Sequence, residues 1–208
     1  APQEIVKFLR EKLVVPADRC YAQTSPLDTG CLFKLAGRIS GDGSHNAMFY
    51  PPAKPMQAPA GYDLYTEVRK HDALLAYPYQ SIRPFIRMLL RAAADPDVVS
   101  IKMTLYRMAS DSQIVNALIA AAENGKEVVA MVELRARFDE QNNIDWSKQL
   151  EDAGCTVFYG FDDYKVHSKL TLITSRVNGQ YKYLTQIGTG NYNEKTSELY
   201  TDLSFITT

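Results

Sequence analysis

The chain has 208 residues, 46% of them hydrophobic and 23% charged, which is typical of a globular protein with a sizeable core. Its 23 lysines and arginines are balanced by 24 acidic residues, so the net charge gives no reason to expect nucleic acid or an anionic membrane as a partner. The longest aliphatic run, residues 117–122, is far shorter than the ~20 residues of a membrane span, and the N-terminus lacks the apolar core of a signal peptide. We therefore expect a cytoplasmic protein in which any anion binding is local.

The three cysteines do not indicate a disulfide framework or a zinc site. Cys20, Cys31 and Cys155 are widely spaced, odd in number and form no CxxC pair. The chain does not begin with Met, and residues 4–13 already have the apolar spacing of a helix. We therefore expect a piece of a longer, intracellular protein.

Two regions are predicted on either side of a segment rich in glycine and proline. Residues 40–61, "SGDGSHNAMFYPPAKPMQAPAG", are crowded with residues that interrupt helices and strands. Before this segment the first helix is followed by short extended or turn segments, and so short a region rarely folds alone. We therefore interpret residues 1–59 as the tail of a preceding domain with its link, and residues 60–208 as one compact domain.

After the link, helices and strands alternate along the chain. Pro84 lies where the first turn of a helix tolerates it, a serine or aspartate can cap the next helix, and Asn124-Gly125 and Gly154 can end two helices. This alternation, followed by consecutive strands, predicts an α/β fold with a mixed β-sheet, parallel in its first half and flanked by helices on its faces. The predicted helices are residues 81–94, 110–126 and 142–153, and the predicted strands are residues 98–106, 127–134, 156–161, 165–174, 181–188 and 199–207.

The segment "VHSKL", residues 166–170, places a histidine and a lysine inside one of these strands. With a side-chain period of two, His167 and Lys169 would project from the same face, about 7 Å apart. An imidazole is substantially neutral at pH 7, and a nearby ammonium disfavours its protonation, so a ring nitrogen could attack phosphorus while the lysine holds the phosphate. The alternative is a structural histidine under a loop, with a lysine that reaches into water.

Two further patterns could bind phosphate. In "QIGTGNYN", residues 186–193, two glycines and Asn191 could let backbone N–H groups and an amide approach an oxyanion, although an ordinary turn after a strand uses the same residues. Arg107 and Arg137 each follow a predicted parallel strand, and ligands of open α/β sheets bind at such strand ends. Their guanidinium groups could make charge-assisted hydrogen bonds to phosphate, or ion pairs with neighbouring carboxylates.

The pair "HSK" and "GTGN" resembles half of a phospholipase D active site, and a longer set of motifs resembles the polyphosphate kinase family of the phospholipase D related type. The resemblance covers nearly all of residues 60–208 and implies a phospholipase D-like sheet. Residues 1–58 are compatible with the tail of the helical domain that precedes this sheet in the family. The motifs are "YPYQS", "DPDVVSIKMTLYR", "NALIAAAENGKEVVAMVELRARFDEQNN", "KVHSKL" and "IGTGNYNEKTSELYTD".

The resemblance implies reversible transfer of the ATP γ-phosphate to polyphosphate through a phosphohistidine, with ATP, ADP and polyphosphate as partners and Mg²⁺ as cofactor. His167 matches the family's phosphorylated histidine, and Tyr200 matches its nucleotide-binding tyrosine. Arg107 and Arg137 match its arginines at the Mg²⁺-phosphate site. Because arginine has no lone pair for a cation, we assign both arginines to phosphate oxygens that the metal also holds. Without the resemblance, Tyr200 would be interpreted as filling the core in the last strand.

The resemblance also implies that the chain holds one half of an active site. In the phospholipase D pattern an aspartate stands five positions after the lysine, where this chain has Thr174, so a diesterase mechanism is disfavoured. We expect the second half of the site beyond Thr208, and little or no kinase turnover by this chain alone. The full-length protein is expected to be a homo-oligomer that could also associate with the membrane through its other parts. The alternatives are a phospholipase D type phosphodiesterase and a non-catalytic polyanion-binding module.

Overall fold

The computed structural model describes residues 2–23, 29–41, 43, 47, 54–109, 111–133, 140–161 and 163–208. The chain forms two compact units, Ala1–Pro52 and Ala53–Thr208.

The first unit is helical and has no buried core among its described residues. It contains α1 (Gln3–Leu13), the short 3₁₀ helix η1 (Ala17–Arg19) and α2 (Cys31–Gly41). The helix predicted at residues 4–13 is confirmed, whereas the prediction of extended or turn segments after it is wrong at α2. Neither α1 nor α2 buries a residue. None of the described helices, in either unit, is long and apolar enough to cross a membrane.

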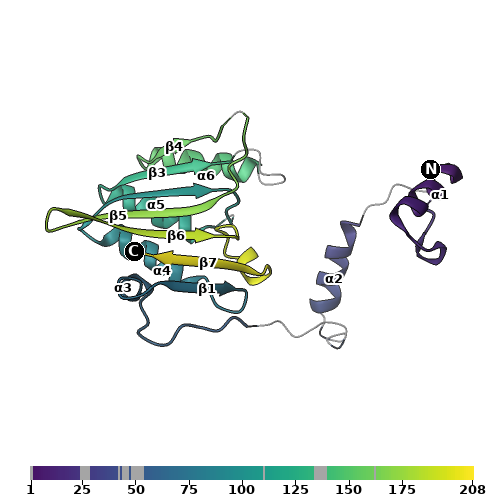
Figure 1. Ribbon diagram of the computed structural model, residues 1–208, viewed down its shortest axis with the longest axis horizontal. Helices are drawn as coiled ribbons and strands as arrows, with labels where there is room; N and C mark the ends of the chain where they lie inside the picture. The colour runs from purple at the N-terminus through teal and green to yellow at the C-terminus, as the bar shows by residue number, and fades with distance from the viewer. Residues whose placement is uncertain are drawn as a thin grey trace. The chain divides into compact units, whose positions relative to one another are not determined.

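The second unit is built on a seven-stranded mixed sheet (Figure 1). The strands lie in the order β1-β7-β6-β5-β2-β3-β4. β2, β3 and β4 are parallel, and all the other pairings are antiparallel, so the predicted mixed sheet is confirmed. The strands are β1 (Ala73–Tyr77), β2 (Val98–Leu105), β3 (Glu127–Val132), β4 (Thr156–Phe158), β5 (Lys169–Val177), β6 (Gln180–Gly188) and β7 (Asp202–Thr207).

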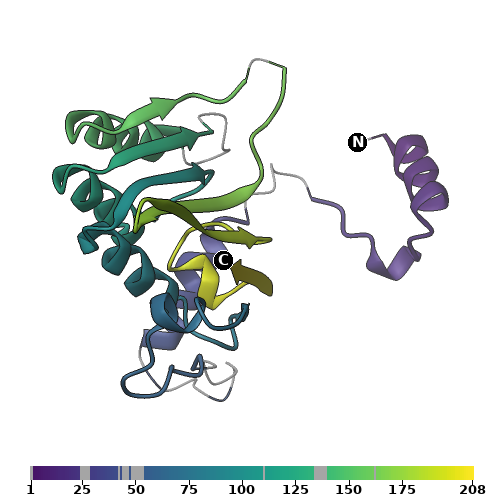
Figure 2. The same cartoon turned by 60° about the vertical axis from the view of Figure 1, so that its left-hand side comes forward.

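Three helices cover one face of this sheet. α4 (Arg83–Ala94), α5 (Gln113–Glu123) and α6 (Glu140–Asp152) lie together on the same side (Figures 1 and 2). The short helix α3 (Leu64–Glu67) packs against α4, and the 3₁₀ helix η3 (Thr196–Glu198) lies between β6 and β7. Helices were expected on the faces of the sheet. In the described part of this unit they cover one face.

The helices begin and end where the sequence indicates. Pro84 lies in the first turn of α4, and the Ser112 hydroxyl caps α5 by accepting a hydrogen bond from the Val115 N–H at 3.4 Å. Gly125 and Gly154, just beyond α5 and α6, adopt positive φ angles of 79° and 88°, which favour glycine. These ends fix which residues of each helix face the sheet.

The core lies between the helices and the sheet. Alternate residues of β2 point into it, which leaves the residues between them on the opposite face. The largest fully buried side chains are Leu64, Phe85, Met88, Leu89, Ile101, Leu105, Met108, Ile114, Leu118, Leu150, Ile173 and Ile206.

The opposite face of the sheet carries an exposed apolar row. Leu74 pairs with Phe205, Phe205 with Ile187, and Ile187 with Leu170, so the row crosses β1, β7, β6 and β5. All four side chains are exposed. This face is therefore apolar without being covered by a helix that the structure describes in the second unit.

Candidate active site

Five strand ends meet at one edge of the sheet. β2, β3 and β6 end there, while β5 and β7 begin there, as their pairing registers require. Arg107 follows β2, His167 precedes β5, Asn191 follows β6 and Tyr200 precedes β7. Arg137 lies outside the described residues. The topology thus brings the other predicted site residues to the same edge, as expected for strand ends of an α/β sheet.

His167 lies in a segment before the strand rather than inside it. β5 begins at Lys169, so the prediction that the strand starts at residue 165 is wrong. The physical reason is a long-range contact, because the backbone groups on either side of Lys169 bond to the side chain of Thr104 instead of to the β2 backbone. The imidazole is consequently exposed at the edge of the sheet.

A buried carboxylate anchors the segment that carries His167. The backbone N–H of Val166 donates to Oε2 of Glu133 at 3.0 Å. Glu133 directly follows β3 and is only 4% exposed, and Val166 is buried as well. A hydrogen bond from a neutral N–H to a carboxylate is stronger than a neutral pair, so the residue next to His167 is held firmly.

The surroundings of the imidazole favour its neutral form. The Tyr106 ring lies 4.8 Å from the imidazole, centroid to centroid, with an interplanar angle of 81°. The pKa of His167 is lowered from 6.5, chiefly by partial burial and then by the positive charges of Lys169, Lys165 and Arg107. A neutral ring has a nitrogen lone pair available, which is what a nucleophile requires.

Lys169 is buried and bonds to the backbone of His167. Its side chain is only 3% exposed, and Nζ donates to the backbone carbonyl of His167 at 2.5 Å. Burial lowers the pKa of Lys169, the Asp202 carboxylate opposes that shift, and Arg107 adds to it. The prediction that both residues lie within one strand is wrong, because β5 begins at Lys169, and the ammonium lies close to the segment that carries His167.

Arg107 brings a second cation to the same place. Its guanidinium carbon lies 5.8 Å from the centroid of the Tyr106 ring. Its charge lowers the pKa of both His167 and Lys169. The structure thus groups three of the predicted residues, and an anion bound among them would offset the repulsion between their charges.

Gly190, just after β6, allows a neighbouring side chain to pack closely against the backbone. A Cβ at Gly190 would overlap the side chain of Asp202, and the Thr189 hydroxyl donates to Oδ1 of Asp202 at 2.8 Å. The Asp202 carboxylate thus packs directly against Gly190 in the turn after β6. The structure favours the turn interpretation for Gly190. The side-chain oxygen of Asn191 is buried and accepts no hydrogen bond from the described residues.

Tyr200 does not fill the core. It precedes β7 and is 63% exposed, which excludes the alternative drawn from its place in a predicted strand. An exposed ring at this edge is available for stacking.

A buried amide that was not predicted from the sequence holds these parts together. Asn143 of α6 is fully buried, and its Nδ2 donates to the carbonyls of Tyr106 and Glu133, at 2.8 and 2.9 Å. It thereby ties the end of β2 to the end of β3. Its helical spacing from the buried Trp146 and Leu150 is the signal that places this amide on the sheet-facing side of the helix.

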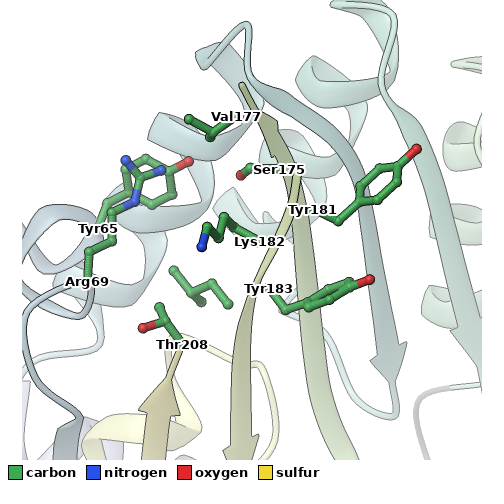
Figure 3. Close-up of a pocket in the computed structure, with 9 residues that line it drawn as sticks. Tyr65, Arg69, Ser175, Val177, Tyr181, Lys182, Tyr183 and Thr208 are labelled. Carbon is green, nitrogen blue, oxygen red and sulfur yellow. The ribbon is translucent and has the colours of Figure 1, made fainter. Parts of the chain in front are cut away.

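A cavity of about 580 Å³ lies at the opposite end of β5 and β6 (Figure 3). Ser175 and Val177 line it at the far end of β5 from Lys169, and Val177 lies about 26 Å away along this nine-residue strand. Figure 3 shows Tyr181 and Tyr183 pointing away from Arg69 and Lys182. This cavity is therefore separate from the histidine site.

Comparisons with known proteins identify the family. The family profile for polyphosphate kinase C-terminal domain 1 matches residues 63–208. A polyphosphate kinase of Bacillus anthracis is 43% identical over 208 residues, which make up 99% of this chain and 29% of that protein. A polyphosphate kinase of Exiguobacterium sibiricum is 42% identical over 206 residues, 98% of this chain and 28% of that protein. The chain thus spans less than a third of the length of these relatives.

Solved structures agree with this assignment. The crystal structure of the polyphosphate kinase from Porphyromonas gingivalis matches with a TM-score of 0.64 and 35% identity, over 79% of this chain and 28% of that one. A phospholipase D family member from Salmonella typhimurium matches over 65% of this chain and 82% of that one, with a TM-score of 0.48 and 18% identity, too distant to carry an argument. The chain belongs to the polyphosphate kinase family, and residues 63–208 match the first C-terminal domain of that family.

Proposed function

We propose that His167 is the nucleophile of a reversible phosphoryl transfer between ATP and polyphosphate, carried out by full-length members of this family. The observation that carries the proposal is an exposed imidazole whose neutral form is favoured, next to two cationic side chains, Lys169 and Arg107. Such a site suits a reaction in which the protein supplies a nucleophile and offsets negative charge.

The proposed reaction has two displacement steps at one phosphorus atom. A ring nitrogen of His167 attacks the γ-phosphorus of ATP, the bond to the bridging oxygen breaks, and ADP leaves with the electron pair. A terminal oxygen of polyphosphate then attacks the same phosphorus, the nitrogen–phosphorus bond breaks, and the chain is longer by one phosphate. Arg107, together with Arg137, would bind the equatorial oxygens, and Tyr200 would stack on the adenine.

Mg²⁺ fits this proposal as a complex with phosphate. No group of three or more histidine, cysteine or acidic side chains that could hold a metal is present in the described parts of the chain. Mg²⁺ commonly binds through one or two carboxylates together with substrate phosphates. Arg107 and Arg137 would therefore bind oxygens that also contact the ion. When bound, Mg²⁺ would neutralise charge on the phosphates.

Exposing the chain to ATP labelled at the γ-phosphate, with Mg²⁺, tests the proposal. We expect label on the protein that is labile in acid and stable in base, as a phosphohistidine is. His167→Ala should lose the label completely. His71→Ala is the matched control and should keep it, because His71 precedes β1 and its Nδ1 lies 3.0 Å from the Glu67 carbonyl oxygen, away from the site.

Three results would contradict the proposal. One is label that survives in His167→Ala or in acid. Another is binding of ATP and polyphosphate without any label, a result that indicates a polyanion-binding module. Hydrolysis of a nitrophenyl phosphodiester would indicate a phospholipase D type diesterase. In the same incubation we expect no long polyphosphate, because the chain spans only 29% of its relative's length and we expect the second half of the site beyond Thr208.

A further inference from the structure

Two side chains at the end of β2 support the segment that carries His167. Thr104 lies near the end of β2, and Tyr106 directly follows the strand. Leu105, between them, is fully buried on the helix side, so Thr104, its neighbour in the strand, faces the other way. Tyr106 lies just beyond the strand and is half-buried. Neither residue belongs to the nucleophile or to the cationic groups that the proposed reaction uses.

Thr104 holds the backbone on both sides of Lys169. Its hydroxyl donates to the carbonyl of Ser168 at 2.7 Å and accepts from the N–H of Leu170 at 3.0 Å. A hydroxyl can do both at once because it has one proton and two lone pairs. The last backbone-paired residues of β2 and β5 are Met103 and Thr171, so the hydroxyl continues the ladder where the backbones separate.

Tyr106 contacts the functional groups themselves. Its ring lies edge-to-face with the imidazole of His167, with the centroids 4.8 Å apart. Nζ of Lys169 lies 5.1 Å from the same ring centroid, and the guanidinium carbon of Arg107 lies 5.8 Å from it. One ring therefore contacts the histidine and both cations, and both kinds of contact are attractive.

We propose that Thr104 and Tyr106 are positioning residues for the phosphoryl transfer at His167. Thr104 fixes the peptide groups around Lys169, whose ammonium in turn binds the His167 carbonyl. Tyr106 fixes the plane of the imidazole and its distance from Arg107. The inference rests on the proposed function, in which displacement of a reacting group by about 1 Å can slow the reaction by about 100-fold.

The first experiment needs no catalysis. The chain has only three histidines, so NMR can follow the imidazole signals of His167 individually. In Tyr106→Leu we expect these signals to shift towards those of a rotationally averaged histidine, whereas Tyr106→Phe should keep the native signals. Tyr164→Leu is the matched control, since Tyr164 is exposed in the same segment and has no ring contact with His167 among the described residues.

A second pair of variants covers the case in which Tyr106→Leu does not fold. Thr104→Val keeps the volume and removes the hydroxyl, and Thr104→Ser keeps the hydroxyl. In Thr104→Val we expect faster hydrogen exchange at the Leu170 N–H and shifted His167 signals. In Thr104→Ser we expect neither change. Folded Tyr106→Leu and Thr104→Val variants whose His167 signals match the wild type would overturn the inference.

The second experiment measures the rate of labelling from ATP. Tyr106→Leu and Thr104→Val should label His167 about 10- to 100-fold more slowly than the wild type, and Tyr106→Phe and Thr104→Ser at close to the wild-type rate. Wild-type rates in the first two variants would overturn the inference. If the proposed function is wrong, the wild type itself takes no label, which distinguishes that outcome from failure of the positioning role. The NMR comparison does not depend on labelling and tests the positioning role in either case.

Discussion

At the scale of single residues, the charge state of His167 is set by what surrounds it. Partial burial contributes most to lowering its pKa, and the charges of Lys169, Lys165 and Arg107 contribute further. The proposed nucleophile is the neutral ring. The same neighbours that would attract a phosphate therefore keep the imidazole reactive at pH values where an isolated histidine is mostly protonated.

An NMR titration of the imidazole tests this relationship. The midpoint for His167 should lie below 6.5, and Lys169→Met should raise it because one positive charge is removed. Lys182→Met is the matched control, since Lys182 lines the cavity at the far end of the sheet, and it should leave the midpoint unchanged. A wild-type midpoint above 6.5 would contradict this description of the site.

The lowered pKa of His167 also determines how the free energy of unfolding changes with pH. The folded state holds the His167 proton less tightly than the unfolded chain, so the unfolded chain binds more protons in the pH range between the lowered folded pKa and the unfolded pKa of about 6.5. The contribution of His167 to the free energy of unfolding therefore becomes less favourable as the pH falls through that value. Above it, both states hold the ring neutral and the contribution is constant.

At the scale of elements, the turn after β6 depends on its packing against β7. Gly190 leaves room for the Asp202 side chain, and the Thr189 hydroxyl both donates to Asp202 and accepts from the Leu203 N–H at 2.9 Å. The Thr189 N–H also donates to the Leu203 carbonyl at 3.0 Å. The turn and the start of β7 thus form one packed unit beside Lys169.

Gly190→Ala should therefore lower the free energy of unfolding by about 1–3 kcal/mol, because the added methyl group displaces the Asp202 side chain. Urea denaturation measures the change. Gly37→Ala is the control, since its Cβ would meet open space in α2 and alanine favours a helix. An unchanged denaturation midpoint for Gly190→Ala would show that the turn is not held against Asp202.

The elements that were predicted from the sequence are those with strong local signals. α4 and α5 carry helical apolar periodicity with a first-turn proline or a serine cap, and β2 and β3 are β-branched runs after glycine or proline turns. β1 was not predicted because it is a five-residue strand at the edge of the described sheet, and the strand that it pairs with there, β7, lies far along the chain. α2 was missed because Gly37 and Gly41 interrupt its pattern.

At the scale of the whole molecule, the topology explains the site. Parallel order places the ends of β2 and β3 together, and the antiparallel return of β5 brings His167 back to them. The sequence predicts this meeting point, because strand ends in α/β sheets have a known geometry. It could not predict that Lys169 is buried or that the Thr104 hydroxyl continues the ladder beyond the last backbone pair, since both depend on contacts between residues more than sixty positions apart.

The exposed apolar row across β1, β7, β6 and β5, over which no helix described in the second unit lies, is also a property of the whole sheet. The residues of this row alternate with buried residues along each strand, so the sequence pattern of each strand alone is that of an ordinary half-buried strand. Only the register shows that Leu74, Phe205, Ile187 and Leu170 lie side by side. A contiguous exposed patch of this kind is typical of a surface that contacts other protein.

A crystal structure of the chain soaked with vanadate tests directly whether His167 is the nucleophile beside Arg107. Vanadate mimics a phosphoryl group during its transfer. We expect vanadium bonded to a ring nitrogen of His167, with its oxygens within hydrogen-bonding distance of the Arg107 guanidinium. Vanadate bound elsewhere, with His167 facing only solvent or turned away from Arg107, would contradict this expectation.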